Sequence, residues 1–157
     1  MVFNKEKMMN WQIKGMNELT ARELYEILKV REEVFIVEQN CIYHDIDFKD
    51  ELSHHLFLEN EQKEVVACCR IIPRGISYPE VSIGRVLTKA THRKTGLGKE
   101  MMQRAIDFIE KEWQETEIRI SGQLYLLEFY KSLGFEQVSE VYLEDNQDHI
   151  ELLYKSR

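Results

Sequence analysis

The chain has 157 residues, of which 43% are hydrophobic and 31% charged, and its formal net charge is −7 at pH 7. This length fits one domain over residues 1–157, with a buried core that we expect to span roughly residues 10–155. Seven glycines and two prolines exclude a collagen-like or low-complexity chain. The negative charge provides no overall basic field, so we expect neither nucleic acid nor a membrane surface as a partner.

The cysteines and the N-terminus point to a cytoplasmic protein. Cys41, Cys68 and Cys69 form no CxxC pair, and their number is odd, so we expect three buried structural thiols rather than a disulfide or a zinc site. The first ten residues hold no apolar run typical of a signal peptide. No stretch approaches the ~20 apolar residues of a membrane span. The composition is compatible with a monomer or a homodimer.

The first half of the chain predicts one helix among several strands. Thr20 and Glu23 form a capping box, and apolar residues then recur at helical spacing as far as Phe35. Residues 38–50 follow no period and predict a loop rich in aspartate. Alternating or apolar segments bounded by polar turns predict strands at Trp11–Lys14, His55–Glu59, Val65–Ile72 and Val81–Thr88.

The second half predicts two helices and the remaining strands. Apolar residues from Leu97 to Ile109 mark a long amphipathic helix, and a second helix is expected at Leu124–Leu133. Gly134 is placed to end that helix in a left-handed conformation, with Phe135 packing back on it. Strands are expected at Ile118–Ser121 and in a closing hairpin of Val138–Leu143 with Ile150–Tyr154. This order of elements predicts a mixed α/β fold.

The segment Arg93–Gly98 reads R-x-x-G-x-G between an expected strand and an expected helix. Glycines let backbone N–H groups approach a ligand, and a helix start adds unpaired amides and the positive end of the helix dipole. Arg93, with Lys94 or Lys99, adds positive charge. These features predict a pyrophosphate-binding loop. Neither the dinucleotide GxGxxG motif nor the Walker A motif fits the residues around it.

This loop, together with Gly84–Thr88 before it and Phe129–Phe135 after it, resembles the GNAT superfamily of acyl-CoA N-acyltransferases. The resemblance covers nearly the whole chain and implies a mixed, twisted central β-sheet flanked by helices, with acetyl-CoA as the cosubstrate. Acetyl-CoA would enter where two neighbouring parallel strands, Val81–Thr88 and Ile118–Ser121, splay apart. The residues that the resemblance implies for acetyl-CoA are Val86, Leu87 and Thr88 on the strand and Arg93, Lys94, Thr95, Gly96, Leu97 and Gly98 in the loop. Lys94 stands where many members carry glycine.

Attack of an amine on a thioester needs a deprotonated amine, a stabilised oxyanion and a protonated leaving group. The resemblance makes Tyr130 the candidate acid, because the matching tyrosine often protonates the departing thiolate; otherwise it is an ordinary core aromatic. The backbone N–H of Val86 or Leu87 is the candidate for polarising the carbonyl. Glu38, directly or through water, is the candidate base.

The segment Arg31–Tyr43 and the aspartates after it resemble the ElaA branch of the superfamily. We expect Asp45 and Asp47 to line the site of the acceptor, an amine of a small molecule or a protein. The segment holds four carboxylates, those of Glu38, Asp45, Asp47 and Asp50, and only Arg31 and Arg70 are expected to pair with them. This predicts a surplus of negative charge, which favours cationic amines. The same arginines and aspartates equally fit a structural ion network.

Two other functions remain open from the sequence. Arg31, Phe35, Asp47, Asp50 and Arg70 also resemble the pattern of acyl-homoserine-lactone synthases, and a non-catalytic acyl-CoA sensor would need the loop alone. No metal is expected, because the five histidines show no ligand spacing and neighbouring His54 and His55 would point to opposite faces of a strand. His149 is expected to be structural or to line the substrate site.

Overall fold

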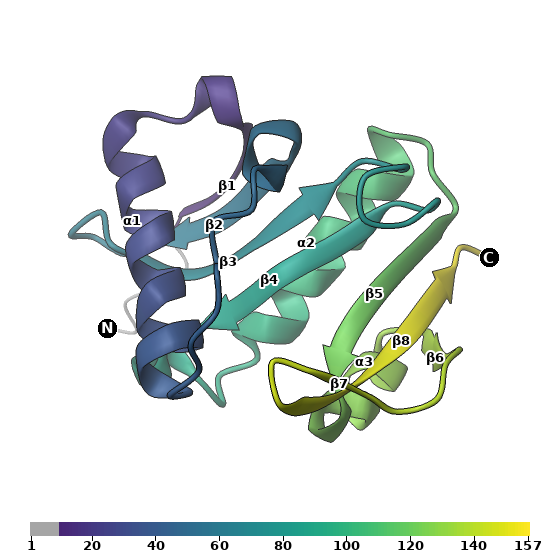
Figure 1. Ribbon diagram of the computed structural model, residues 1–157. Coiled ribbons are helices and arrows are strands. Elements are labelled where there is room, and N and C mark those ends of the chain that lie inside the picture. The colour runs from purple at the N-terminus through teal and green to yellow at the C-terminus, as the bar shows by residue number, and fades with distance from the viewer. Residues whose placement is uncertain (1–9) are drawn as a thin grey trace, which may run out of the picture.

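The structure is a computed structural model that describes residues 10–157 (Figure 1). Its helices are α1 (Ala21–Arg31), α2 (Leu97–Lys111) and α3 (Leu127–Ser132), with a π-helix at Glu32–Glu38 that continues α1 and short 3-10 helices at Met16–Glu18, Lys49–Leu52, Ala90–His92 and Leu124–Leu126. Its strands are β1 (Asn10–Gly15), β2 (His54–Glu59), β3 (Val65–Ile72), β4 (Ser82–Thr88), β5 (Glu117–Gln123), β6 (Phe135–Gln137), β7 (Tyr142–Glu144) and β8 (Gln147–Lys155). None of the helices in this range is long and apolar enough to cross a membrane.

The strands form two antiparallel sheets that meet along β4 and β5. One sheet has the order β1-β2-β3-β4 and the other β5-β8-β6, with β7 also paired to β8. Val81 makes a parallel bridge to Ile118, and the Arg119 N–H donates to the Val81 carbonyl at 2.9 Å. From this junction β4 and β5 diverge toward their C-terminal ends (Figure 1). The mixed α/β fold predicted from the sequence is therefore confirmed, with the parallel contact confined to the junction.

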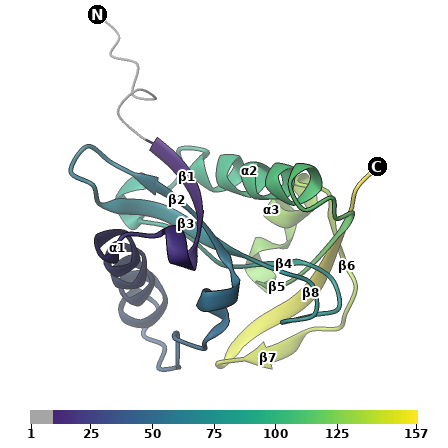
Figure 2. The same cartoon turned by 90° about the horizontal axis from the view of Figure 1, so that it is seen from above.

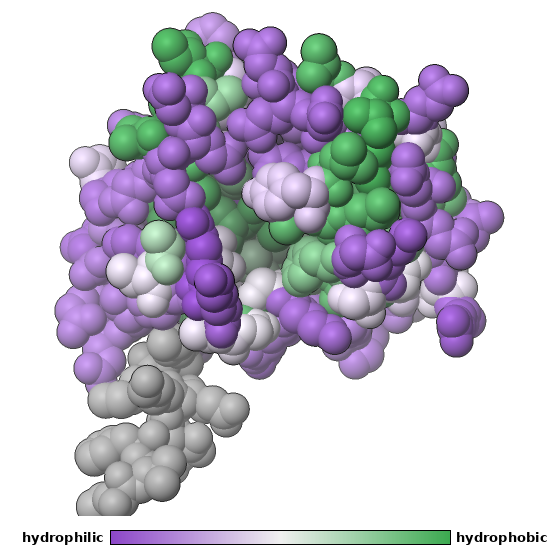
Figure 3. All heavy atoms as spheres, turned by 90° about the horizontal axis from the view of Figure 1, so that it is seen from below, coloured by the Kyte–Doolittle hydropathy of each residue, from purple (hydrophilic) through white to green (hydrophobic). Residues whose placement is uncertain are grey.

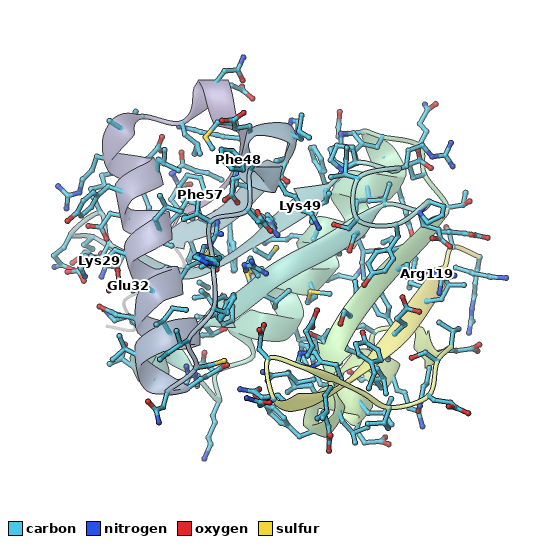
Figure 4. The ribbon with its side chains drawn as sticks, viewed as in Figure 1. Lys29, Glu32, Phe48, Lys49, Phe57 and Arg119 are labelled. Atoms are coloured by element: carbon cyan, nitrogen blue, oxygen red, sulfur yellow. The ribbon has the colours of Figure 1, made fainter. Side chains whose placement is uncertain are left out.

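An ion pair reinforces the junction at which β4 and β5 are joined. The Arg119 guanidinium on β5 donates three hydrogen bonds of 3.0–3.2 Å to the Glu80 carboxylate, which lies just before β4 (Figure 4). A bidentate arginine–carboxylate pair fixes direction as well as distance. The two strands are held together at one end, so they separate only at the other.

Helices cover both faces of the β1–β4 sheet, with α1 on one side and α2 on the other, and α3 lies on the same side as α2 (Figure 2). On one face α2 packs Met101, Met102 and Ile106 into a large core with residues of both sheets, and on the other α1 packs against a smaller cluster around Phe57. Every residue of β3 is buried, as expected for a strand covered on both sides. The prediction of buried thiols is confirmed for Cys68 and Cys69, whereas Cys41 is half-buried.

The C-terminal third departs most from the expected elements. The helix expected at Leu124–Leu133 is split, because Leu126 (φ −97°, ψ 9°) leaves helical geometry between a 3-10 turn and α3. The strand expected at Val138–Leu143 is wrong over Val138–Val141, since β7 begins only at Tyr142. The unexpected β6 pairs instead with the far end of β8, whose nine residues are long enough for two partners. Gly134 has φ +101° and Phe135 is buried, as predicted.

Candidate active site

A cleft of about 1460 Å³ occupies the space between the diverging strands. Its walls come from the π-helix, β4, the start of α2, the end of β5, α3 and the β7–β8 hairpin. Figure 3 views the molecule from the end toward which β4 and β5 run, and shows a hollow with apolar surface inside, bordered mainly by polar residues on the left and by hydrophobic residues on the right. All but two of the site residues predicted from the sequence line this cleft. The exceptions are Thr95, whose hydroxyl donates to the His92 carbonyl, and Asp45, which lies beneath two arginines.

The Arg93–Gly98 segment forms a loop at the start of α2 that has the features expected of an anion-binding site and is called the anion-binding loop below. Gly96 has φ +83° and Lys94 has φ +61°, so the chain turns sharply before the helix. The first helical bond runs from Glu100 N–H to the Gly96 carbonyl (3.1 Å), which leaves the three preceding amides without helical partners. A Cβ at Gly98 would come no closer than 3.8 Å to Phe129 or Thr88, so this backbone is open to the cleft. These groups fit a pyrophosphate.

A β-bulge shapes the strand beside this loop. Cys68 pairs with Leu87 and Arg70 with Gly84, so Cys69 alone stands opposite both Arg85 and Val86. Arg85 has φ +50°, a left-handed conformation that a bulge accommodates. Among the described residues the other edge of β4 pairs with β5 only at Val81. Val86 and Leu87 therefore lie along a free backbone edge that can bind amide groups of a ligand.

Tyr130 lies on α3 at the floor of the cleft. Its ring packs against β5, where a Cβ on Gly122 would come within 2.8 Å of it, so only glycine leaves room for the ring. Its hydroxyl has no hydrogen-bond partner within residues 10–157 and is not among the fully enclosed polar atoms. Burial raises the pKa of Tyr130 well above the ordinary value for tyrosine. The phenol therefore stays protonated at neutral pH and can give a proton to a group in the cleft.

Glu38 ends the π-helix and reaches the anion-binding loop. The i+5 bond from Cys41 N–H to the Ile36 carbonyl (3.1 Å) widens the helical turn here. The Glu38 carboxylate lies 2.6 Å from the Arg93 guanidinium, whose Nε also donates to the Thr88 carbonyl at 2.9 Å. Both side chains of the pair are 39% exposed. Glu38 thus lies at the cleft, but its nearest charged partner is the arginine predicted to hold pyrophosphate.

The aspartates after the π-helix form an ion network with three arginines. Arg31 contacts Asp45 and Asp50, at 2.9 and 2.7 Å, and the Arg70 guanidinium contacts Asp47 and Asp50, at 2.6 and 3.2 Å. Burial opposes ionisation of Asp47 and Asp50, but their hydrogen bonds to the guanidinium groups outweigh it and hold both pKa values below the ordinary value. These carboxylates are charged and fully paired.

Arg85, on the bulge, is the network member that the sequence reasoning missed. Its guanidinium lies 2.7 Å from Asp45 and 3.4 Å from Asp47. With Arg85 and Arg93 included, each of the four carboxylates expected to form a negative surplus has an arginine partner. The expected surplus at these residues is therefore wrong, because the tertiary fold brings in two arginines that are distant in sequence.

The β7–β8 hairpin supplies a polar wall that the sequence reasoning did not assemble. Ser121 on β5 hydrogen-bonds Tyr142 and Glu144 on β7, and His149 on β8 lies beside Glu144. The hairpin also contacts the segment after the π-helix, since Gln147 donates to Gln39 (3.5 Å). The sequence pattern of these short strands does not indicate their pairing, so it could not predict that these side chains line one wall of the cleft. Within residues 10–157, no group of three His, Cys, Asp or Glu side chains is placed to hold a metal ion.

Comparison with known families agrees with this fold and cleft. The family described as "Acetyltransferase (GNAT) domain" matches residues 16–154. The chain belongs to the GNAT family of acetyltransferases. Within that family it is similar to the protein ElaA of Escherichia coli, to which it is 36% identical over 146 residues, or 91% of this chain and 94% of ElaA.

Solved structures give the same result. Escherichia coli ElaA superposes with a TM-score of 0.88 at 34% identity, covering 94% of this chain and 100% of ElaA. An acyl-CoA N-acyltransferase from Pseudomonas aeruginosa superposes with a TM-score of 0.88 at 36% identity, covering 93% of this chain and 99% of the other. The AHL synthase LasI, at 15% identity and a TM-score of 0.76 over 94% of this chain and 89% of its own, shares the fold alone.

Proposed function

We propose that the protein transfers an acetyl group from acetyl-CoA to a primary amine of a small molecule or a protein. The observation that carries this proposal is that the amide-rich start of α2, with Gly96 at φ +83°, opens into the same cleft as the protonated Tyr130 hydroxyl. A phosphate-binding loop alone fits many ligands. Its combination with a proton donor and a free strand edge fits a thioester cosubstrate whose leaving group must be protonated.

The roles of the chain's own residues follow from their places along the cleft. The amides of Leu97 and Gly98 and the guanidinium of Arg93 would hold the pyrophosphate of acetyl-CoA. The free β4 edge at Val86 and Leu87 would bind the pantetheine amides and polarise the thioester carbonyl. Tyr130 would protonate the departing sulfur. Asp47, which lines the cleft, would contact the acceptor amine. The free cysteines fit a reducing compartment such as the cytoplasm.

The decisive experiment measures CoA release from acetyl-CoA with a thiol reagent, against a panel of primary amines. We expect release that depends on the amine, with the acetylated amine identified by mass spectrometry. Tyr130→Phe is the matched variant, because it keeps the ring and removes a hydroxyl that has no hydrogen-bond partner within residues 10–157. Binding of CoA without release by any amine would favour a sensor. If no amine is acetylated, and the protein instead forms a lactone from S-adenosylmethionine and an acyl group on a carrier, a lactone synthase would be favoured.

A further inference from the structure

The polar wall formed by the β7–β8 hairpin contains an imidazole and a carboxylate that the roles above leave unused. His149 begins the buried part of β8, and its Nε2 lies 3.3 Å from the Glu144 carboxylate of β7. The Tyr142 ring stacks on the imidazole, with ring centroids 6.2 Å apart and planes inclined by 27°. His149 is 12% exposed and lines the cleft, as Glu144 does. The imidazole is therefore held in one orientation while keeping access to the cleft.

The backbone fixes the tautomer of His149. Its Nδ1 lies 2.8 Å from the Gln147 carbonyl. A carbonyl oxygen only accepts hydrogen bonds, so Nδ1 carries a proton and Nε2 of the neutral ring has a free lone pair. When Nε2 takes a proton, the Glu144 carboxylate is in place to stabilise the cation. Glu144 thus lies at the nitrogen that takes the proton, while the Gln147 carbonyl holds the other nitrogen.

The strand register places this pair across the sheet from Tyr130. Side chains alternate along β5, so Gly122 faces Tyr130 and its neighbours Ser121 and Gln123 face the other side. Gln123 pairs directly with His149, and paired residues of antiparallel strands share a face. Tyr130 and His149 thus lie on opposite faces of the sheet formed by β5 and β8. A nucleophile reaching the carbonyl from one face would meet His149, while the sulfur leaves toward Tyr130.

The carboxylates of the cleft are less suited to take a proton, whereas two further imidazoles that line it, His44 and His92, have to be compared with His149 by substitution. Glu38 is paired with Arg93, and Asp47 is bound by two arginines. Glu144 and Tyr142 on β7 contact His149 directly, and Tyr78 before β4 and Glu151 on β8 lie near Tyr142. Burial raises the pKa of Tyr142 and raises that of Tyr78 to about 12, so both phenols stay protonated at neutral pH. Imidazole is the side chain whose ordinary range lies closest to neutral pH.

We propose that His149, stabilised by Glu144, is the general base that takes the proton of the acceptor amine. This rests on the proposed acetyl transfer. An ammonium gives one proton to Nε2, and the freed nitrogen lone pair forms the C–N bond. As the C–S bond breaks, the nitrogen gives its second proton to water and the sulfur takes one from Tyr130, which is reprotonated from water. The imidazolium then returns the first proton to water. Each turnover therefore yields amide and CoA thiol and releases one proton to water.

The test uses acetyl-CoA and the amine that reacts fastest in the panel, with rates measured across pH. We expect His149→Gln to lower kcat/KM by ~10²–10⁴-fold and to remove the inflection nearest neutral pH. His149→Ala should lose the same activity and regain part of it on addition of imidazole, a rescue that a structural role would not give. Glu144→Gln should lower the rate and displace the inflection, because the imidazolium loses its partner. His44 and His92 also line the cleft, so loss of the inflection in His44→Gln or His92→Gln instead would reject His149 as the base. The exposed Glu140→Gln is the matched control for Glu144→Gln.

Calorimetry with CoA separates failure of this proposal from failure of the proposed function. CoA affinity within about twofold of wild type in His149→Gln shows that the cleft is intact. An unchanged pH profile in a variant that still binds CoA and acetylates the amine would reject His149 as the base and leave acetyl transfer standing. Loss of the inflection in Glu38→Gln instead would also reject it. If the wild type binds CoA but no amine is acetylated, the proposed function fails and the base assignment with it.

Discussion

The Glu38 carboxylate lies 2.6 Å from the Arg93 guanidinium and connects the end of the π-helix to the anion-binding loop. Arg93 is also held by its Nε bond to the Thr88 carbonyl, so the guanidinium is oriented along the cleft. A pyrophosphate bound at this loop would compete with Glu38 for the same guanidinium. The residue that the sequence suggested as base is thus engaged with the loop that we propose binds the cosubstrate.

This competition predicts opposite effects of two substitutions on CoA affinity. Glu38→Gln removes the competing charge and should tighten CoA binding about twofold to fivefold, a modest change because both side chains are exposed. Arg93→Ala should weaken binding by about tenfold, or ~1.4 kcal/mol. Isothermal titration at two salt concentrations measures both, and the gain in Glu38→Gln should shrink as salt rises. Weaker CoA binding in Glu38→Gln would contradict the competition.

Gly98 allows stability and binding to be separated. Gly98→Ala should stabilise the free protein by about 0.5 kcal/mol, because alanine is the better helix residue and its Cβ meets only ordinary contacts. The same methyl group would stand where the backbone approaches the pyrophosphate, so CoA affinity should fall by about tenfold. Urea unfolding and calorimetry measure the two effects, with the exposed Gln103→Ala on α2 as the control. Unchanged affinity would place the pyrophosphate elsewhere.

Tyr130 should matter for the chemical step and little for binding or folding. Tyr130→Phe removes a hydroxyl that has no partner in residues 10–157, so the free energy of unfolding should change by less than about 1 kcal/mol. If the phenol protonates the sulfur, kcat should fall by ~10²–10⁴-fold with CoA affinity nearly unchanged. Steady-state kinetics and calorimetry decide this. Wild-type turnover in the variant would assign the proton to water or another group.

Asp50 should be the most important ionic residue for stability. Its carboxylate contacts both Arg31 and Arg70, whose side chains are 2% and 4% exposed, so Asp50→Asn leaves two buried guanidinium groups short of a partner. Loss of one member of a buried network costs roughly 3–5 kcal/mol. Urea unfolding at pH 7 measures this cost, with the exposed Glu51→Gln as the control. A cost below about 1 kcal/mol would show that solvent compensates the arginines.

The same cluster predicts a loss of stability in acid. The pKa of His55 is lowered by burial and by the two guanidinium groups, and the pKa values of Asp47 and Asp50 are lowered by their arginine partners. In each case the unfolded chain binds the proton more readily, so the contribution is complete above the unfolded pKa and is lost as pH falls. We expect the free energy of unfolding to fall first below about pH 6.5 and then more steeply below about pH 4. His55→Gln should remove the first decrease. Stability that stays constant from pH 7 to 5 in the wild type would contradict this assignment.

Local signals in the sequence determined much of this protein. The capping box of Thr20 and Glu23, the helical spacing after Leu97 and the glycines of the Arg93–Gly98 segment act within a few residues, so their elements form where the pattern predicts them. The family resemblance of the loop and of the Phe129–Phe135 segment led to the fold that the comparisons support. The short strands β6 and β7 were misjudged, because three-residue strands depend on pairing with β8 rather than on a pattern of their own.

Only the tertiary structure decided the charges and partners of the site. Arg85 pairs with Asp45, 40 residues away in the sequence, and Arg93 pairs with Glu38, 55 residues away. The folded chain therefore supplies arginine partners for carboxylates that have none nearby in the sequence. The pairing of His149 with Glu144 depends on the hairpin register, and its placement opposite Tyr130 depends on the alternation of side chains along β5. Composition and spacing act over a few residues. Ion pairing acts through distances that only the folded chain sets.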